Sequence, residues 1–386
     1  MLGAGVFWVW GPVVERAGSL LIAAIVIAGI LALLNALSVA QLALLVPESG
    51  GVYAYANRYL SHGAGFLAGW LFLVGKISSV AAISVIAATY AVPSQAHWVA
   101  PALIAVFAAI NMTGVRSTAG VALGVTVLVV AVLLAIVVSS APVANTLSVS
   151  VTPDAYELWQ AAGLMFFAFA GYARMATLGA EVKNPTTVLP RVIVGTLVAV
   201  IALYVMVGLG VVGALGIDGV VSSAAPVADA APESWRLLVV ITAVVACLGS
   251  LGALLAGLSR TAMAMASNND APRALATVSD RTRTPIRAEL VMAVAAIVAS
   301  AVVDPLWLVG LSSATVLSYY AIGHLCMVRV PKNERRLPVV LSWVGLMGCV
   351  SLVFALPVAS LLMGAGALIV GGAALWGLRI ARNRAG

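Results

Sequence analysis

The sequence has little charge. Only 9% of its 386 residues are Asp, Glu, Lys or Arg, and 63% are hydrophobic, whereas soluble domains carry about 25% charged residues. This composition excludes an ordinary soluble globular domain. The net charge of +7 does not indicate binding to nucleic acid, because the basic residues form no single patch or tail. They separate apolar runs instead, as they do in the cytoplasmic loops of membrane proteins.

Cysteine and histidine are also scarce, with three residues of each. Cys247, Cys326 and Cys349 all lie in apolar runs, and no histidine or acidic residue stands beside them at metal-ligand spacing. We therefore expect no disulfide framework, no metal site and no cofactor. The sequence lacks an HExxH motif, paired carboxylates within apolar runs and a nucleophile–base arrangement, so a membrane enzyme is the least supported interpretation. No cleavable signal sequence is visible, and a multispanning chain does not need one.

What the sequence has in abundance is long apolar runs. A helix needs about 20 apolar residues to cross a bilayer, and eleven runs predict an all-α integral membrane protein. The runs are 19–45, 66–91, 98–113, 119–141, 156–180, 191–216, 235–266, 286–304, 306–328, 338–356 and 358–379. The first residues, MLGAGVFWVWGP, make about half a span. We expect them to be the outer half of a first helix whose inner half is missing, most simply through a start codon assigned too late.

The basic residues predict the orientation of the chain in the membrane. If the loop between the second and third predicted helices is cytoplasmic, sixteen Lys and Arg residues fall inside and only Arg16 and Arg236 fall outside. This excess of basic residues on one side is strong. It predicts a protein of the cell membrane whose C-terminus is cytoplasmic. Among the inside residues are Arg58, Arg116, Lys183, Arg260, Arg273, Arg329 and Arg379.

The segment from Leu164 to Pro190, LMFFAFAGYARMATLGAEVKNPTTVLP, predicts a broken membrane helix. An apolar stretch reaches the small residues Ala170 and Gly171, then carries Arg174 within the predicted span. Broken membrane helices expose backbone groups that lipid cannot satisfy, so a break is tolerated where it lines a cavity. The alternative is an unbroken spanning helix, because glycine is common in membrane helices.

Five segments in order resemble one protein family. They are GAGVF (Gly3–Phe7), PESGGVYAYANRYL, NMTGVRSTA, FFAFAGYARMATLGAEVKNP (Phe166–Pro185) and SRTAMAMASNNDAPRALATVSDRTRTPIRA (Ser259–Ala288). Together they resemble the amino acid–polyamine–organocation (APC) permeases over essentially the whole chain. The resemblance implies a leucine-transporter-type fold with a 5+5 inverted repeat and two extra helices. Residues 1–386 would form one transporter domain, with repeats at 1–141 and 156–329 and the extra helices at 338–379.

The resemblance also implies where a substrate binds. At the break of the first helix, Gly3, Ala4, Gly5 and Val6 would offer backbone N–H groups and a positive helix-dipole end to a carboxylate. At the second break, the carbonyls between Phe167 and Ala170, next to Gly171, would accept hydrogen bonds from an α-ammonium group. Phe169 and Tyr172 are candidate gating aromatics, with packing in the membrane as the alternative. Pro47, Gly50, Gly51 and Tyr53 resemble part of a cytoplasmic gate.

Two departures from the family pattern bear on the substrate. Many members carry an acid directly after the aromatic of the second break, where this chain has Ala173 followed by Arg174. A lost acid and a gained cation argue against lysine, arginine and polyamines and favour neutral, or else acidic, amino acids. Arg174 has a structural alternative, in which it pairs with a carboxylate or with carbonyls.

Lys76 is the candidate for proton coupling. Proton-coupled relatives often carry a lysine in the fifth helix, but the alignment from GVRSTA places Val129 there. An unpaired buried lysine exchanges its proton more readily than one in water, so Lys76 is a proton carrier or a substrate-site charge. The alternatives are snorkelling and a fixed structural pair. His324 titrates near neutral pH or is a hydrogen-bonded packing residue, and only one of Tyr319 and Tyr320 can face the cavity.

The sequence therefore predicts a secondary transporter that moves an amino acid by proton symport or exchange, through alternating access. The small-molecule substrate and the membrane lipid are the expected partners, and nucleic acid is not. Two other interpretations stay open. One is an exchanger of amines or other metabolites, and the other is a permease-like protein that no longer transports.

Overall fold

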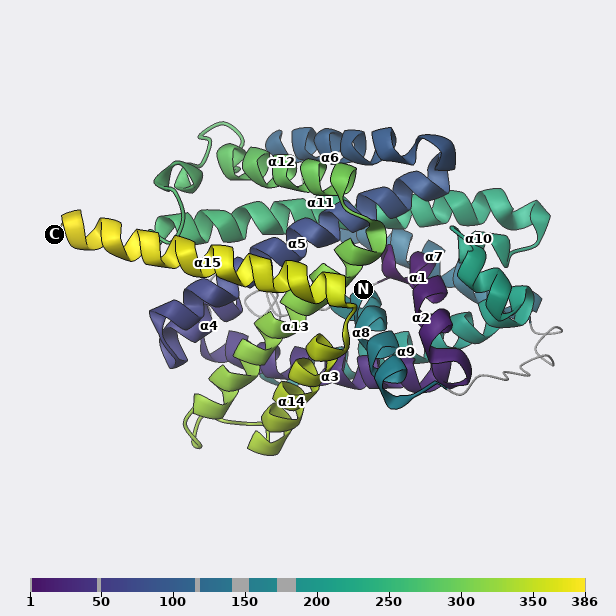
Figure 1. Ribbon diagram of the computed structural model, residues 1–386, viewed down its shortest axis with the longest axis horizontal. Helices are drawn as coiled ribbons and strands as arrows, with labels where there is room; N and C mark the ends of the chain where they lie inside the picture. The colour runs from purple at the N-terminus through teal and green to yellow at the C-terminus, as the bar shows by residue number, and fades with distance from the viewer. Residues whose placement is uncertain (1, 47–49, 115–118, 141–152, 172–184, 386) are drawn as a thin grey trace.

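The computed structural model describes residues 2–46, 50–114, 119–140, 153–171 and 185–385, and all regular structure in these ranges is helical (Figure 1). A helix occupies each of the eleven predicted runs. These helices are α3 (Leu21–Leu45), α5 (His62–Ala91), α6 (Ala96–Met112), α7 (Ala119–Ser140), α8 (Ala155–Phe169), α9 (Pro185–Ser222), α11 (Glu233–Ser267), α12 (Ile286–Val302), α13 (Pro305–Arg329), α14 (Val339–Ala355) and α15 (Val358–Ala385). The short helices α1 (Gly5–Trp8), α2 (Trp10–Ala17), α4 (Val52–Tyr59) and α10 (Pro226–Asp229) complete the set.

The lengths of the helices support an integral membrane protein. Within the described residues, eight helical stretches are long and apolar enough to cross a membrane. Three helices that we expected to span, α8, α12 and α14, have 15, 17 and 17 described residues, fewer than the usual 20. The membrane character of the chain is thus confirmed, whereas the count of eleven spans and the inverted repeat stay predictions.

Local sequence explains several helix ends. Asp154 and Glu157 form a capping box at the start of α8, in which each side chain accepts a hydrogen bond from the other's backbone N–H. The hydroxyl of Ser61 caps α5 by accepting from the Ala64 N–H at 3.2 Å. Gly18 separates α2 from α3 with φ of +46°, a conformation that is costly for residues with a Cβ.

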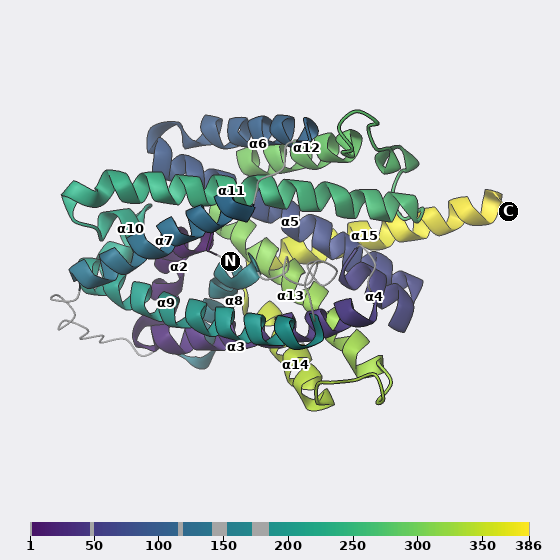
Figure 2. The same ribbon diagram turned by 180° about the vertical axis from the view of Figure 1, so that it is seen from behind.

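The helices form two mutually packed groups. In one group α2, α3, α8 and α9 contact one another, and in the other α5, α6, α11 and α12 do. Helix α13 lies between the groups and packs on both α5 and α3. In both ribbon views α6 and α12 lie together at one edge and α3 lies toward the opposite edge (Figures 1 and 2).

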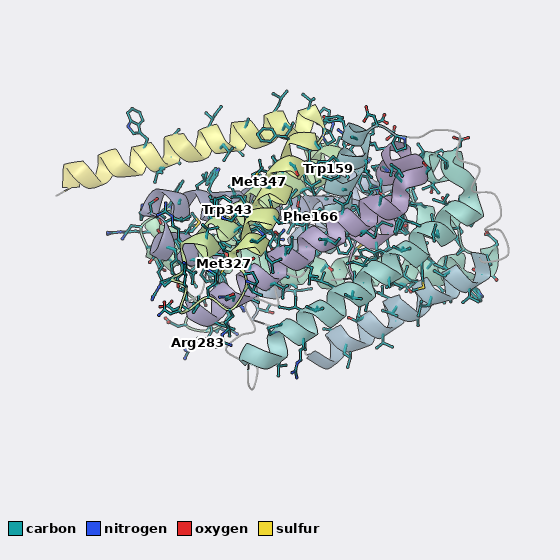
Figure 3. All side chains as sticks on the ribbon, turned by 90° about the horizontal axis from the view of Figure 1, so that it is seen from below. Trp159, Phe166, Arg283, Met327, Trp343 and Met347 are labelled. Atoms are coloured by element: carbon teal, nitrogen blue, oxygen red, sulfur yellow. The ribbon has the colours of Figure 1, made fainter. Side chains whose placement is uncertain are left out.

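The apolar surface lies mainly on the peripheral helices. Trp343 and Met347 on α14 are 47% and 64% exposed, and both are labelled in Figure 3. Only 11% of the most apolar stretch of α15 is buried inside the protein. The end of α15 extends beyond the other helices (Figures 1 and 2). Such exposed apolar faces would be a liability in water, and a bilayer is the solvent that accepts them.

Candidate functional site

The predicted carboxylate site lies at the start of α1. Gly3 and Ala4 precede the helix, whereas Gly5 and Val6 form its first turn. The backbone is helical from Gly5 onward, so only Gly3 and Ala4 of the predicted set lie before the first turn. The first backbone N–H groups of a helix have no partner within the helix, so the donors expected of this segment remain at its start.

The backbones of α1 and α8 touch at Gly5. A Cβ on Gly5 would lie 2.5 Å from Ala168 Cα and 2.9 Å from Ala168 Cβ, distances that side-chain carbons do not adopt. Gly3 is equally tight against a second helix, because a Cβ there would lie 2.6 Å from Ser250 Oγ on α11. The structure therefore brings together the two segments that the sequence singled out, and glycine permits the contact.

Helix α8 ends where the break was expected. Its last residue is Phe169, and the Ala170 N–H donates to the Phe167 carbonyl. The Tyr204 hydroxyl, from α9, donates to the Ala168 carbonyl at 2.9 Å. Two of the carbonyls that we expected to receive an α-ammonium group therefore already accept one hydrogen bond each. A carbonyl oxygen has two lone pairs, so each can accept a second hydrogen bond.

Phe169 is fully buried among neighbouring helices. Its ring lies 4.9 Å from that of Tyr204, between centroids, and its Cζ is close to Gly29 on α3. This environment corresponds to the packing alternative for Phe169, while its gating role stays a prediction. The larger described cavity, of about 330 Å³, is lined by residues of α5 and α15 only, and none of them belongs to the predicted site.

Several predicted residues lie outside the described ranges. They are Tyr172, Ala173, Arg174, Lys183 and, in the loop after α3, Pro47. The roles of the second gating aromatic and of the charge after α8 therefore stay predictions.

Lys76 is buried near the middle of α5. It is 3% exposed and lies fourteen residues, or about 21 Å, from the first residue of α5. A lysine side chain is too short to bring its ammonium group over this distance to the end of the helix. Its Nζ lies 5.8 Å from the centroid of the Phe72 ring, and the described residues contain no acidic partner within ion-pair distance.

Lys76 belongs to a polar seam between α5 and α13. Ser79 and Ser312 hydroxyls lie 2.7 Å apart, and a Cβ on Gly75 would lie 2.5 Å from Thr315 Oγ1. The seam reaches α8 through aromatic rings. Phe72 contacts Tyr319 at 5.3 Å, Tyr319 contacts Tyr320 at 5.2 Å, and Tyr320 contacts Phe166 edge-on at 6.5 Å between centroids. Phe166 is labelled in Figure 3.

The two tyrosines of α13 face different partners. The Tyr319 hydroxyl accepts from the Val52 N–H at 2.9 Å, so Tyr319 holds the segment after α3. Tyr320 is the one whose ring meets α8. His324, one turn further along, is 1% exposed, with Nε2 2.8 Å from Asn35 Oδ1 and Nδ1 3.1 Å from Ser38 Oγ. The hydrogen-bonded packing alternative for His324 is thus confirmed.

Tyr53, the gate candidate, lies on α4 beside the end of α11. Its hydroxyl donates to Asp270 Oδ2 at 2.7 Å and accepts from Asn268 Nδ2 at 3.0 Å. Burial and the hydrogen bond to Asp270 raise the pKa of Tyr53 to about 12. Tyr53 therefore stays neutral, and remains a donor, over the whole physiological pH range.

Comparison with known proteins identifies the family. The model of the "Amino acid permease" family matches residues 1–379. An uncharacterized transporter of Mycobacterium tuberculosis is 42% identical over all of this chain and 89% of its own length. The vacuolar cationic amino acid transporter 2 of Arabidopsis thaliana is 29% identical over 87% of this chain and 59% of its own length. The branched-chain amino acid permease of Bacillus subtilis is 27% identical over 53% of this chain and 50% of its own length.

The chain belongs to the amino acid permease family. The predicted resemblance to APC permeases is thereby confirmed over the whole chain. The family and the relatives are transporters rather than enzymes, which agrees with the sequence interpretation. Membership supports amino acid transport by this permease, without specifying its substrate or its coupling.

Sequence analysis of this permease missed two buried acids. It found no carboxylate within the predicted spans, but Glu289 in α12 is 3% exposed and accepts from Asn111 Nδ2 at 2.8 Å. The same Nδ2 donates to the Gly252 carbonyl at 3.0 Å, so Asn111 joins α6, α11 and α12. The other acid is Asp270, also 3% exposed. A single sequence does not show that either acid is buried, because both look like ordinary acids at helix ends.

Proposed function

We propose that this permease carries a neutral amino acid across the cell membrane by alternating access, with the substrate held between residues 3–6 and 167–171. The observation that carries the proposal is the contact between Gly5 and Ala168. It supports a site in which backbone N–H groups at the start of α1 lie beside the carbonyls at the end of α8. A zwitterion needs both a donor set for its carboxylate and an acceptor set for its ammonium group.

Lys76 supports a neutral substrate. A buried cation without a described acidic partner lies on the seam whose rings reach Phe166 of α8. A cationic substrate side chain would be repelled by Lys76 at low dielectric. The relatives transport both kinds of substrate by name, because one is a branched-chain amino acid permease and another a cationic amino acid transporter. The charge of Lys76, together with Arg174, favours the first.

Proton coupling through Lys76 is the second part of the proposal. The place of Lys76 supports this part, because it lies far from either end of α5 and no acid among the described residues pairs with it. Val129, at the position where many relatives carry a coupling lysine, is fully buried in α7. Proton symport and exchange both remain compatible with a titrating lysine at this place.

The two packed groups of helices are the expected moving parts. We expect α2, α3, α8 and α9 to rock against α5, α6, α11 and α12. Ala168 lies in the first group, against which Gly5 of α1 packs, and Lys76 lies in the second. A proton on Lys76 could therefore bias the position of one group relative to the other.

Counterflow in proteoliposomes tests the proposal. Vesicles loaded with unlabelled amino acid are given a labelled panel of neutral, acidic and cationic amino acids and of amines. We expect accumulation of one or more neutral amino acids, without lysine or arginine. Accumulation of a cationic amino acid would instead favour a substrate like that named for the plant relative. Accumulation of an amine would favour the exchanger interpretation. An inactive preparation that binds no amino acid by calorimetry would favour a permease-like protein that does not transport.

A further inference from the structure

A buried polar cluster, which we name the Asp270 cluster, joins two distant segments of the chain. Its members are Tyr53, His62, Asn268 and Asp270. Asp270 receives the Tyr53 hydroxyl at 2.7 Å on Oδ2 and lies 2.9 Å from His62 Nε2 through Oδ1. The Asp270 side chain is 1% exposed, whereas that of His62 is 44% exposed. One end of the cluster is thus dry and the other reaches solvent.

The Asp270 cluster connects the corner between α4 and α5 with the end of α11. Tyr53 belongs to α4 and His62 is the first residue of α5, while Asp270 directly follows the turn that ends α11. The Asp270 N–H donates to the Met265 carbonyl at 2.8 Å, which fixes the acid to α11. The corner lies in the first predicted repeat and α11 in the second. Helices α5 and α11 belong to the same packed group, so the movement that the cluster resists is that of α4, which carries Tyr53, away from the end of α11.

Apolar packing beneath the cluster fixes its geometry. Tyr53, Phe66 and Met265 belong to a small hydrophobic cluster separate from the main core. Gly69 of α5 makes room for it, because a Cβ there would lie 2.7 Å from Met265 Sδ and 3.0 Å from Tyr53 Cδ2. The Tyr53 ring is therefore held by packing, and its hydroxyl is aimed at Asp270.

His62 is the histidine of the Asp270 cluster and the member that reaches solvent. Histidine is the side chain that ordinarily titrates between pH 5 and 8, whereas the raised pKa of Tyr53, about 12, keeps that hydroxyl protonated. A protonated His62 forms an ion pair with buried Asp270, and a neutral one forms only a hydrogen bond. Hydrogen bonds between charged partners are roughly twice as strong as neutral ones.

The other charged groups near this corner have their own partners or face solvent. The Arg58 guanidinium lies 5.8 Å above the Tyr59 ring on α4. Arg273 Nε donates to Asn269 Oδ1 at 2.9 Å. The first turn of α5 contains no acid. Asp280, Arg281, Arg283 and Arg287, in the segment after α11 and at the start of α12, are exposed.

We propose that the Asp270 cluster is a proton-responsive latch on the predicted cytoplasmic side, which a protonated His62 tightens and a neutral His62 loosens. The inference rests on the proposed function and on the predicted orientation. Acidification of the cytoplasm would fix Asp270 between His62 and Tyr53, hold α4 against the end of α11, and slow an opening toward the inside that requires α4 to move. In a proton-coupled importer, protons delivered with substrate would thus limit further uptake.

Hydrogen–deuterium exchange of the full chain in nanodiscs tests the latch without any substrate. Protection of the amides in Val52–Tyr59 is compared at pD 5.5 and 7.5, after correction for the intrinsic pH dependence of exchange. In the wild-type chain we expect about fivefold greater protection at pD 5.5, the low end of measured coupling between sites, because His62 is half exposed. His62→Gln retains a neutral donor toward Asp270 and should show equal protection at both values.

His97→Gln is the matched control, because His97 is an exposed histidine at the start of α6, far from the Asp270 cluster along α5, and should keep the wild-type response. The latch is refuted if the wild-type chain shows no difference between the two values, or if His62→Gln keeps the fivefold difference. Exchange of amino acid should also slow at acidic internal pH in the wild-type chain and not in His62→Gln. A pH-dependent protection in a chain that carries no amino acid would support the latch and count against the proposed function.

Discussion

Substitution of Gly5 by alanine perturbs the contact on which the proposed substrate site depends. The new Cβ would lie 2.5 Å from Ala168 Cα, where ordinary van der Waals contacts begin at 3.4 Å. Relief requires α1 and α8 to separate by roughly 1 Å, and overpacking of this kind costs about 1–3 kcal/mol. A displacement of about 1 Å in a site that positions reacting groups can lower a rate by about a hundredfold. We expect counterflow to fall by about tenfold to a hundredfold.

Initial counterflow rates in proteoliposomes, normalised to the amount of folded protein, measure this effect. Gly249→Ala is the matched control, since Gly249 lies on α11 beside Ser250 and has no atom within 4 Å of its added methyl group. We expect this control to transport at the wild-type rate. Wild-type counterflow in Gly5→Ala would contradict the assignment of the site, because α1 and α8 could then separate without consequence.

Three further substitutions test other parts of the structure. Lys76→Met should abolish uptake driven by a pH gradient, while unchanged coupling would rule out Lys76 as the proton carrier. Asn111→Ala should destabilise the fold by about 2–3 kcal/mol, because it removes the hydrogen bond to the buried carboxylate of Glu289; a thermal unfolding midpoint equal to the wild-type value would contradict this. Gly51→Ala should cost at least about 1 kcal/mol in the same assay, because Gly51 has φ of +59° and its Cβ would lie 2.6 Å from the Tyr319 hydroxyl.

The helices were the most predictable feature of this permease. A helix satisfies the backbone N–H and C=O groups of an apolar run within lipid. Each predicted run therefore contains a helix among its described residues. The ends were less predictable. Helix α8 ends at Phe169, and α9 extends to Ser222, past the run that we expected to end at 216. Helix α9 includes Gly216 with φ of +70°, a kink that hydropathy does not register.

The pairing of Gly5 with the end of α8 was predictable only through resemblance to a family, because no local signal relates residues so far apart in the chain. Tertiary contacts also decided cases that the sequence left open. Burial and two ring hydrogen bonds settled His324 as a packing residue. The partner of Tyr53 could not be anticipated, because Asp270 follows it by more than two hundred residues. The sequence identified Lys76 as a charged residue within an apolar run, and the structure showed how deeply the Lys76 side chain is buried.

The most direct test of the account is an experimental structure of this permease with a transported neutral amino acid bound. We predict that the substrate carboxylate lies within hydrogen-bond distance of the N–H groups at the start of α1, and that its ammonium group faces the carbonyls between Phe167 and Ala170. A substrate bound elsewhere, with Gly5 and Ala168 still in direct contact and neither segment touching it, would contradict the central claim.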